Sequence, residues 1–299
     1  MPPVSENNAS GPGKLIAMLV DHVSDPFFAG FARRIDRRAR SLGYKLVFGS
    51  TENDISFMPK LISVFNNMNV AGYIIAPPQG VEPDLKKLIL RGSPVVLFDR
   101  FATDPGPYSI LADNFRGAYD AVAHLVQTGR RHIALVTVAS GQKRVDDRTR
   151  GYEAAMNSHS LPATVIELSP AASIGEITTA LQTLLRENKK LDGLLFADSS
   201  LGLTILGILR QHKKSIPDSL AVIGFDDNEN FQFFAPAITA IVQPLDEIVE
   251  NIFHCISGHP YEKATTKRKA PIVLPTRMVT RSSTLKTKVV FPLAATGNQ

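Results

Sequence analysis

The sequence predicts an α/β protein built on doubly wound parallel sheets. Short apolar runs recur along most of the chain, and segments with the 3.6-residue periodicity of amphipathic helices separate them. The runs are rich in Val, Ile and Leu, which is typical of parallel strands buried on both faces. Strands that alternate with helices in this way favour a parallel sheet with helices on either side.

Seven apolar runs predict buried parallel strands, and two shorter runs, YSILA and ITAIV, are also expected to be strands. The seven occupy residues 15–20, 45–49, 72–76, 94–99, 133–138, 193–197 and 220–225. So many strands could form one large sheet or two smaller ones. We expect a domain boundary near residues 138–142, because about five strand–helix units precede this segment and a second series follows it.

The segment after the first predicted strand carries helix signals at both ends. Asp25 is a suitable N-cap, Pro26 suits the first helical position, and Gly43 suits the C-terminal stop. Its apolar residues fall on one helical face: Phe28, Phe31, Ile35 and Leu42.

Composition narrows the class of protein. A chain of 299 residues, 44% hydrophobic and 20% charged, is ordinary for a globular protein of about two domains. The one cysteine, Cys255, excludes an internal disulfide and is expected to be a packing residue. No run approaches the roughly 18 apolar residues that span a membrane, and residues 1–13 have no signal-peptide core. We therefore expect a cytoplasmic protein with a linker-like N-terminal tail.

The net charge of +5 is unevenly distributed. Residues 258–299 hold eight Lys or Arg and one acid, so the rest of the chain holds 25 bases and 27 acids. The body of the protein therefore lacks the broad basic surface expected of a nucleic-acid-binding domain.

The most informative segment is residues 216–244, IPDSLAVIGFDDNENFQFFAPAITAIVQP. It joins a buried strand to two adjacent carboxylates, Asp226 and Asp227, and then to three Phe residues. Ligands of open α/β sheets bind just beyond the carboxyl ends of the strands. Acids beside aromatic rings at such a place predict a polar, hydroxyl-rich small ligand.

The loop after the first predicted strand has two readings. Asp21 or Ser24 could hydrogen-bond a ligand while Phe27 stacks on it, or the loop could form a helix cap with buried aromatic rings. The two readings can coexist.

Polar residues follow other predicted strands as well. Asp99 and Arg100 could be a structural ion pair or one wall of a polar cleft. Asp113 or Asn114 is more readily interpreted as a helix cap, and Asp198 as either a cap or a ligand contact.

Arg148 lies near a predicted helix start, where it could be an exposed arginine or a forked donor to hydroxyls and carboxylates. Polar residues thus recur at the ends of at least four strands in both halves of the chain. A cleft between two α/β domains would gather them around one ligand.

Sequence patterns of common enzymes are missing. The chain has no G-x-S-x-G, no P-loop, no H-E-x-x-H and no G-x-G-x-x-G after its first predicted strand. The last absence also argues against a Rossmann-type dehydrogenase. The seven histidines show no metal-ligand spacing. We expect no enzymatic activity, no cofactor and no metal.

Taken together, these segments resemble the effector-binding region of the lac repressor family of bacterial transcription regulators, across about residues 14–284. The stretches that carry the resemblance are SDPFF (24–28), VAGYIIAP (70–77), PVVLFDR (94–100), ADN (112–114), HLVQTGRRHIALVT (124–137), RTRGYEAAM (148–156), GLLFADSSLGL (193–203), IPDSLAVIGFDD (216–227), PAITAIVQP (236–244) and LPTRMVTRSST (274–284).

The resemblance implies the type I periplasmic-binding-protein fold, with two doubly wound parallel-sheet subdomains joined by a three-stranded hinge. The N-terminal subdomain would comprise residues 14–139 plus 244–271, and the C-terminal subdomain residues 140–243 plus 272–290, with tails at 1–13 and 291–299.

The resemblance also implies a small effector, a sugar or related polar metabolite, bound between the subdomains of a homodimeric regulator. The expected ligand-binding residues are Asp21, Ser24, Phe27, Phe28, Asp99, Arg100, Arg148, Asp198, Asp226, Phe231 and Gln243.

Two departures from the family stand out. The family has Asn-Asp where this chain has Asp198-Ser199, so the contact there is acidic instead of amide. The residues before Lys14 are too few for a helix-turn-helix head, so operator DNA is expected to be bound only through a head missing from these residues. The alternative function is a periplasmic sugar-binding protein of a transport system, which shares the fold but needs a signal peptide.

Overall fold

The computed structural model describes residues 14–23, 25–52, 54–78, 80–100, 108–139, 143–257 and 270–285. They form two compact units. Unit 1 takes its described residues from 1–113, 142–144 and 243–276, and unit 2 from 114–141, 145–242 and 277–299. Each unit is a six-stranded sheet with helices on both faces, which confirms the predicted fold class.

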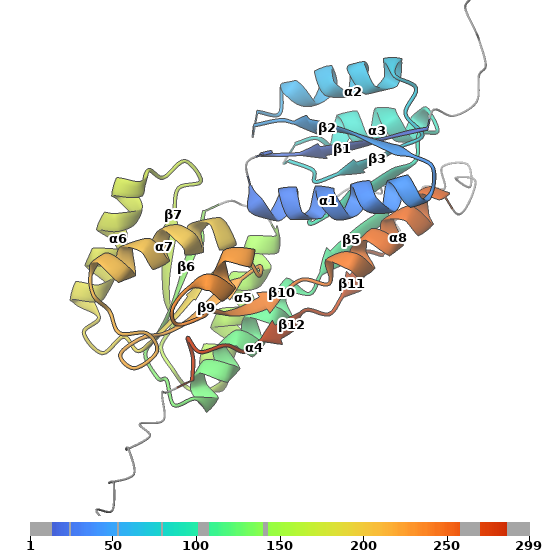
Figure 1. Cartoon of the computed structure of the whole chain (residues 1–299). Coiled ribbons are helices and arrows are strands. Elements are labelled where there is room, and N and C mark those ends of the chain that lie inside the picture. Colours follow the sequence, from blue (N-terminus) through green and yellow to red (C-terminus); the bar gives the residue numbers. More distant parts are fainter. Residues whose placement is uncertain are drawn as a thin grey trace, which may run out of the picture. The chain divides into compact units, whose positions relative to one another are not determined.

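Unit 1 has the strand order β11-β5-β4-β3-β1-β2, with every neighbouring pair parallel. The strands are β1 (Leu15–Val20), β2 (Lys45–Ser50), β3 (Gly72–Ile75), β4 (Val95–Phe98), β5 (Tyr108–Ala112) and β11 (Ile272–Leu274). Helices α1 (Pro26–Ser41) and α8 (Leu245–Ser257) cover one face, and α2 (Phe57–Asn67) and α3 (Glu82–Leu90) cover the other (Figure 1).

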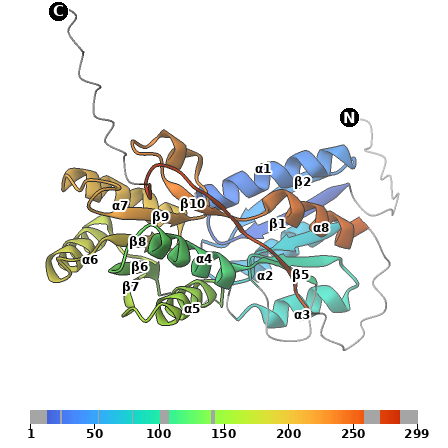
Figure 2. The same cartoon turned by 90° about the horizontal axis from the view of Figure 1, so that it is seen from below.

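Unit 2 repeats this plan in the order β12-β10-β9-β8-β6-β7. Its strands are β6 (Ile133–Val138), β7 (Thr164–Leu168), β8 (Gly193–Phe196), β9 (Ala221–Phe225), β10 (Thr239–Val242) and β12 (Arg277–Val279), of which β12 is antiparallel to β10. Helices α4 (Asn114–Gln127) and α5 (Lys143–Ser158) cover one face, and α6 (Ile174–Glu187) and α7 (Ser199–Gln211) the other (Figures 1 and 2). A short 3-10 helix, η1 (Glu229–Phe233), precedes β10.

The local signals of α1 are confirmed, with one exception. The Asp25 carboxylate accepts a hydrogen bond from the Phe27 amide at 2.8 Å, Pro26 opens the helix, and Gly43 follows it with φ +80°. Phe28 is buried as predicted, but Leu42 is the C-cap and 40% exposed. The prediction that Leu42 lies on the apolar face of the helix is wrong, because α1 ends at Ser41.

The units divide at other residues than the sequence suggested. Residues 114–139 belong to unit 2, because β6 pairs with β7 and β8 there. The chain stays in unit 1 through 276, because β11 pairs with β5. Strands β7, β11 and β12 were not foreseen.

The shared strand order places the first strand of each series, β1 or β6, inside its sheet. In this order the connections reverse direction beside that strand, and the carboxyl ends there are the common ligand-binding edge of α/β sheets. The polar residues that follow the strands therefore gather at one edge within each unit.

Gly151 tests how tightly α5 packs on α4. A Cβ at Gly151 would lie 2.2 Å from the backbone oxygen of Phe115, and a backbone atom cannot move aside as a side-chain tip can. We expect Gly151→Ala to lower the free energy of unfolding by about 2 kcal/mol in urea denaturation. Gly207→Ala in α7 is the control. Nothing lies within 4 Å of its Cβ position, so it should raise stability by about 0.5–1 kcal/mol. Equal effects of the two substitutions would contradict this packing.

Candidate functional site

The charged centre of unit 2 is Arg148, whose side chain is fully buried. Its Nε donates to Asn114 Oδ1 at 2.8 Å, while Nη1 and Nη2 lie 3.1 and 3.4 Å from the two carboxylate oxygens of Asp226. Nη1 also donates to the carbonyl of Ala197, and the guanidinium lies 3.8 Å from the Phe225 ring centroid. One side chain on α5 thereby binds α4 and the carboxyl ends of β8 and β9.

This arrangement decides between the two readings of Arg148. An exposed helix arginine would make few fixed contacts, whereas here a bidentate carboxylate pair, an amide and a carbonyl hold the guanidinium. A buried charge is tolerated only with such partners. Asn114, the first residue of α4, accepts one of these hydrogen bonds from Arg148 through its Oδ1.

Unit 1 carries a second buried cluster at the carboxyl ends of β1 and β4. Arg100 Nη2 pairs with Asp21 Oδ2, and Arg100 Nε lies 3.5 Å from Asp99 Oδ2. All three side chains are at least nine-tenths buried. Asp21 Oδ1, Arg100 Nε and Arg100 Nη1 are buried and make no hydrogen bond within the described part of the chain. The cluster therefore has one acceptor and two donor atoms to offer to another molecule.

A polar network next to this cluster was not foreseen. Ser50 Oγ donates to the backbone oxygen of Asp21 at 2.8 Å and contacts Glu52, whose Oε2 lies 3.1 Å from His22 Nδ1. Hydrogen bonds from Ser50 and then from His22 lower the pKa of Glu52. The polar run Ser50-Thr51-Glu52 at the end of the second predicted strand was the signal for this network.

Two aspartates in the clusters share an uncommon backbone conformation. Asp99 has φ +63° and Asp226 has φ +64°, in the left-handed region that few residues other than Gly, Asn and Asp adopt. They directly follow β4 and β9, which occupy the same place in their two sheets. Strained residues of this kind concentrate at functional sites.

The other predicted ligand residues have mixed outcomes. Phe28 and Phe231 have 2% and 0% of their surface exposed and lie in the two cores. Phe231 packs edge-on against Phe196 at 5.7 Å, so the expectation that its ring flanks a pocket is wrong. Phe27 is half-buried, with its ring centroid 5.3 Å from that of Phe28.

Asp198 caps α7, because its Oδ1 accepts hydrogen bonds from the amides of Ser200 and Leu201 at 2.9 and 3.0 Å. The capping reading is thus confirmed, and ligand contact stays a prediction. Gln243 is buried directly after β10. Ser24 lies outside the described residues.

Asp227 has a different role from its neighbour. Its carboxylate forms a bidentate ion pair with Arg281, with Nη1 and Nη2 at 2.8 and 2.7 Å from the two oxygens. These hydrogen bonds raise the pKa of Arg281. Asn228, not Asp227, caps η1. Asp227 therefore fastens the segment after β12 to unit 2.

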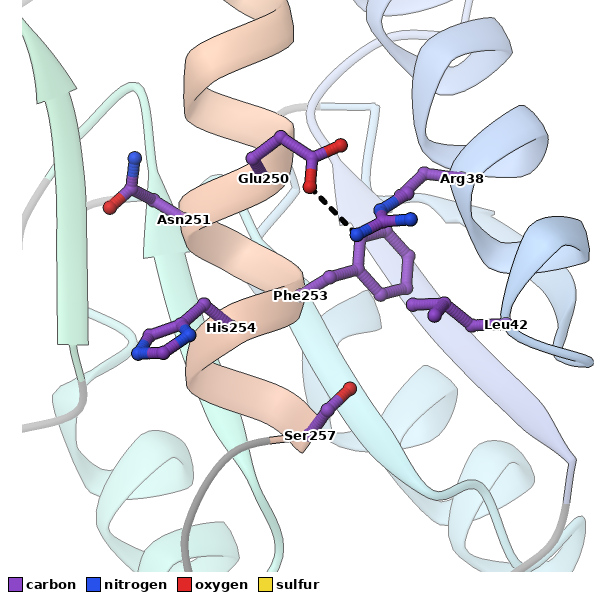
Figure 3. A pocket seen from close by; sticks show the side chains of 7 residues that line it. All are labelled: Arg38, Leu42, Glu250, Asn251, Phe253, His254 and Ser257. Carbon is purple, nitrogen blue, oxygen red and sulfur yellow. Dashed lines mark ion pairs between the residues drawn. The ribbon is translucent and has the colours of Figure 1, made fainter.

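A surface pocket of about 400 Å³ lies elsewhere in unit 1, between α1 and α8 (Figure 3). Arg38 and Glu250 form a 2.8 Å ion pair across it, and Leu42 and Phe253 lie at the same end (Figure 3). None of the predicted ligand residues lines it. The pocket is separate from the charged clusters.

The described residues contain no group of three or more His, Cys, Asp or Glu that could hold a metal ion. None of the described helices combines the length and apolar character that crossing a bilayer needs.

Comparison with known proteins places these features in context. Residues 122–284 match the model of the periplasmic binding protein-like domain. The chain is 27% identical to the HTH-type transcriptional regulator DegA of Bacillus subtilis, over 90% of this chain and 80% of that protein. It is 26% identical to the ribose operon repressor of Escherichia coli, over 79% and 72% of the two chains.

Solved structures show the same fold. A periplasmic binding protein/LacI transcriptional regulator from Alkaliphilus metalliredigens, complexed with D-xylulofuranose, superposes with a TM-score of 0.77 at 23% identity, over 91% of this chain and all of that one. The complex of the transcriptional regulator CelR with cellobiose gives 0.74 at 22% identity, over 91% and 84%. The expected resemblance to the lac repressor family is confirmed.

The Arg148–Asp226 pair can be tested by a double-mutant cycle in urea denaturation. Arg148→Met should lower the free energy of unfolding by about 3–5 kcal/mol, because it leaves the buried carboxylate unpaired. Asp226→Asn keeps a residue that tolerates the left-handed backbone, so it isolates the loss of charge. The free energy of unfolding lost in the double variant should be smaller, by at least about 1 kcal/mol, than the sum of the losses in the two single variants. Strict additivity would contradict the pairing, and the half-exposed Arg116–Asp120 pair, which should couple weakly, is the control.

Proposed function

Because the chain belongs to the family of periplasmic binding protein-like domains, we propose that it is the effector-sensing domain of a bacterial transcriptional regulator. Its effector in this proposal is a sugar or a related polar metabolite. The observation that carries the proposal is the pair of buried, charged clusters at the carboxyl edges of the two sheets. The clusters combine carboxylates with forked guanidinium donors, which is the chemistry that holds hydroxyl groups.

Each unit has its own candidate effector contacts. In unit 1 they are Asp21, Phe27, Asp99, Arg100 and Gln243, and in unit 2 they are Arg148, Asp198 and Asp226. The buried donors and acceptors supply hydrogen bonds, while the half-buried ring of Phe27 offers an apolar face.

The mechanism is a shift between populations of two arrangements of the domain. The effector must bind one arrangement better than the other, since equal affinities would shift nothing. In this proposal a separate helix-turn-helix head binds the operator, and the differential binding changes operator affinity by about 1–3 kcal/mol.

The regulator function is favoured over the alternative of a periplasmic transport protein. Relatives that match most of this chain are transcriptional regulators and repressors, including those of ribose and sucrose operons. A cytoplasmic location follows from the same proposal, because operator DNA lies in the cytoplasm of bacteria. The relatives likewise support a binding protein and not an enzyme.

Substitution of Arg100 tests the proposed contacts. A sugar that binds the native state raises the melting temperature by mass action, so a thermal-shift screen of pentoses, hexoses and disaccharides identifies a ligand. Arg100→Gln should then weaken its affinity at least about tenfold in calorimetric titration, because charge-assisted hydrogen bonds are lost. Arg281→Gln removes an arginine that also pairs with a carboxylate but lies outside the proposed contacts, and it should retain wild-type affinity. Unchanged affinity in Arg100→Gln would remove Arg100 from the site.

We also propose that the domain is a homodimer. Helix α2 and its C-cap carry an outward apolar stripe of Phe57, Leu61, Val64 and Met68, three of which are 41–53% exposed. Their 4-3-4 spacing is that of helices that pack against each other. The helix contains one charged residue, Lys60, so two copies could meet about a two-fold axis with little repulsion.

A charge placed on this stripe tests the dimer. Val64→Glu should convert the protein to a monomer at micromolar concentration in analytical ultracentrifugation, because it would bury an unpaired carboxylate at the interface. Ser63→Glu introduces the same charge on an exposed neighbouring position outside the stripe and should leave the dimer intact. A dimeric Val64→Glu, or a monomeric wild type, would contradict the proposed surface.

A further inference from the structure

Helix α1 concentrates positive charge on unit 1. Five of its 16 residues are Arg, whereas α3 has as many bases as acids and α8 has three acids and no Lys or Arg. Two of these arginines face α8. Arg34 pairs with Asp246 at 3.2 Å, and Arg38 pairs with Glu250 at 2.8 Å. These two fasten the helices to each other, so their charge is already matched.

The other three arginines form a stripe on the outer face of α1. Arg33, Arg37 and Arg40 are separated by four and then three residues, which places them on one side of the helix. All three are exposed, with 77% of the Arg37 side chain and 73% of the Arg40 side chain accessible. Arg33 has no acidic partner in the described part of the chain, and Arg40 pairs with Asp36 one turn back at 2.8 Å. Arg37 lies 3.6 Å from Asp246, which a nearer arginine also contacts.

Two lysines extend the stripe at the amino edge of the sheet. Lys45 opens the edge strand β2, and its amide donates to the backbone oxygen of Lys14, just before β1, at 2.8 Å. Helix α1 ends at the same edge, because the amide of Gly43 donates to the carbonyl of Arg40 at 3.0 Å. Both lysines are exposed, and neither forms an ion pair with a described residue. We call the following five residues the basic ridge: Lys14, Arg33, Arg37, Arg40 and Lys45.

The basic ridge suits an extended polyanion better than a small ligand. It lies on the outside of one helix and at the strand ends beside it, and none of its residues lines the pocket between α1 and α8. Its three arginines span about 10 Å along the helix axis, at about 1.5 Å per residue. One strand of duplex DNA carries a charge about every 3.4 Å along its axis. A row of forked guanidinium groups can therefore follow successive phosphates of one strand.

The place of the basic ridge in the fold favours DNA as that polyanion. The first strand of unit 1 starts beside Lys14, so a helix-turn-helix head that precedes the domain would join it at this amino edge. The head would hold operator DNA on the same side. We propose that the basic ridge contacts the phosphate backbone beside the operator and adds affinity that does not depend on base sequence. This inference rests on the proposed function and assigns a DNA contact to the sensing domain itself. Phosphate contacts of this kind position a protein on the duplex, while the head would read the bases.

Fluorescence anisotropy with a short labelled duplex of arbitrary sequence tests the proposal on this chain. The wild type should bind with a Kd on the order of 10–100 µM at about 50 mM salt, and the affinity should fall as salt rises, because binding releases counterions. The triple variant Arg33→Gln, Arg37→Gln, Lys45→Gln should bind at least about tenfold more weakly. Its slope of log K against log salt should be shallower by about 2–3. All three side chains are exposed, so its melting temperature should match that of the wild type.

A matched variant in unit 2 removes the same number of positive charges. Lys189→Gln, Lys190→Gln, Lys214→Gln changes three exposed lysines and should keep the wild-type slope and affinity. Equal losses in the two triple variants would mean that net charge alone attracts DNA, and they would overturn the proposal. A wild type that does not bind the duplex would overturn it too. In either case, a sugar that raises the melting temperature would leave the proposed function standing.

A substitution that strengthens binding completes the test. Asp36→Asn removes the carboxylate that is paired with Arg40, so the duplex should bind about two- to threefold more tightly. Unchanged affinity in this variant would count against contact at the ridge. Polyglutamate at the same concentration of charge serves as a competitor. If it displaces the duplex as well as unlabelled DNA does, the ridge accepts any polyanion, and the choice of DNA as its partner is overturned.

Discussion

The burial of one guanidinium constrains much of unit 2. Arg148 is fully buried and could not remain charged there without partners on several sides. Asn114 at the start of α4, the carbonyl of Ala197 after β8 and the carboxylate of Asp226 after β9 supply them. Since each partner must be at hydrogen-bonding distance, the pair fixes how α4 and α5 sit over the sheet edge. The same contacts orient Asp226, so the fold and the proposed recognition of the effector depend on one network.

The two units share one structural feature, an aspartate that follows an equivalent strand and lies beside a buried arginine. Asp99 and Asp226 follow equivalent strands, share a left-handed backbone and each lie beside an arginine. The clusters differ in what remains unused. Arg148 makes hydrogen bonds on several sides, whereas two donor atoms of Arg100 and one oxygen of Asp21 make no hydrogen bond within the described residues. The cluster in unit 2 is therefore the more rigid, and the one in unit 1 has more capacity for a ligand group.

Much of the fold could be predicted because buried parallel strands are continuous apolar runs. Three strands were missed: β7, β11 and β12. Strand β7 has the sequence TVIEL, in which Thr164 and Glu167 interrupt the apolar run because the strand lies at the sheet edge, and β11 and β12 are only three residues long. Alternation shows that strands and helices follow each other, but not which sheet a strand joins. That is why residues 114–139 were assigned to the wrong unit.

Site residues could be predicted where their neighbours in the sequence identify them, but not where tertiary packing determines the direction of the side chain. Acids after strands pointed to Asp21, Asp99 and Asp226, yet sequence could not show that Phe231 turns into the core. Its ring meets Phe196 beside Gly224, where a Cβ would lie 2.5 Å from either ring. The network of Glu52 was missed because its partner His22 lies 30 residues away in the chain.

The order in which the chain visits the units has a consequence for biosynthesis. Unit 2 is almost complete once residue 242 has been made, because only β12 and the segment through residue 285 come later among its described parts. Unit 1 starts first but must wait for α8, whose residues Ile248, Val249, Ile252 and Phe253 fill one of its two cores. Until that helix leaves the ribosome, the apolar face beneath it stays open to water and to other chains. Unit 1 therefore begins first but closes this core only late in synthesis, and the nascent protein is most vulnerable to aggregation on the unit 1 side.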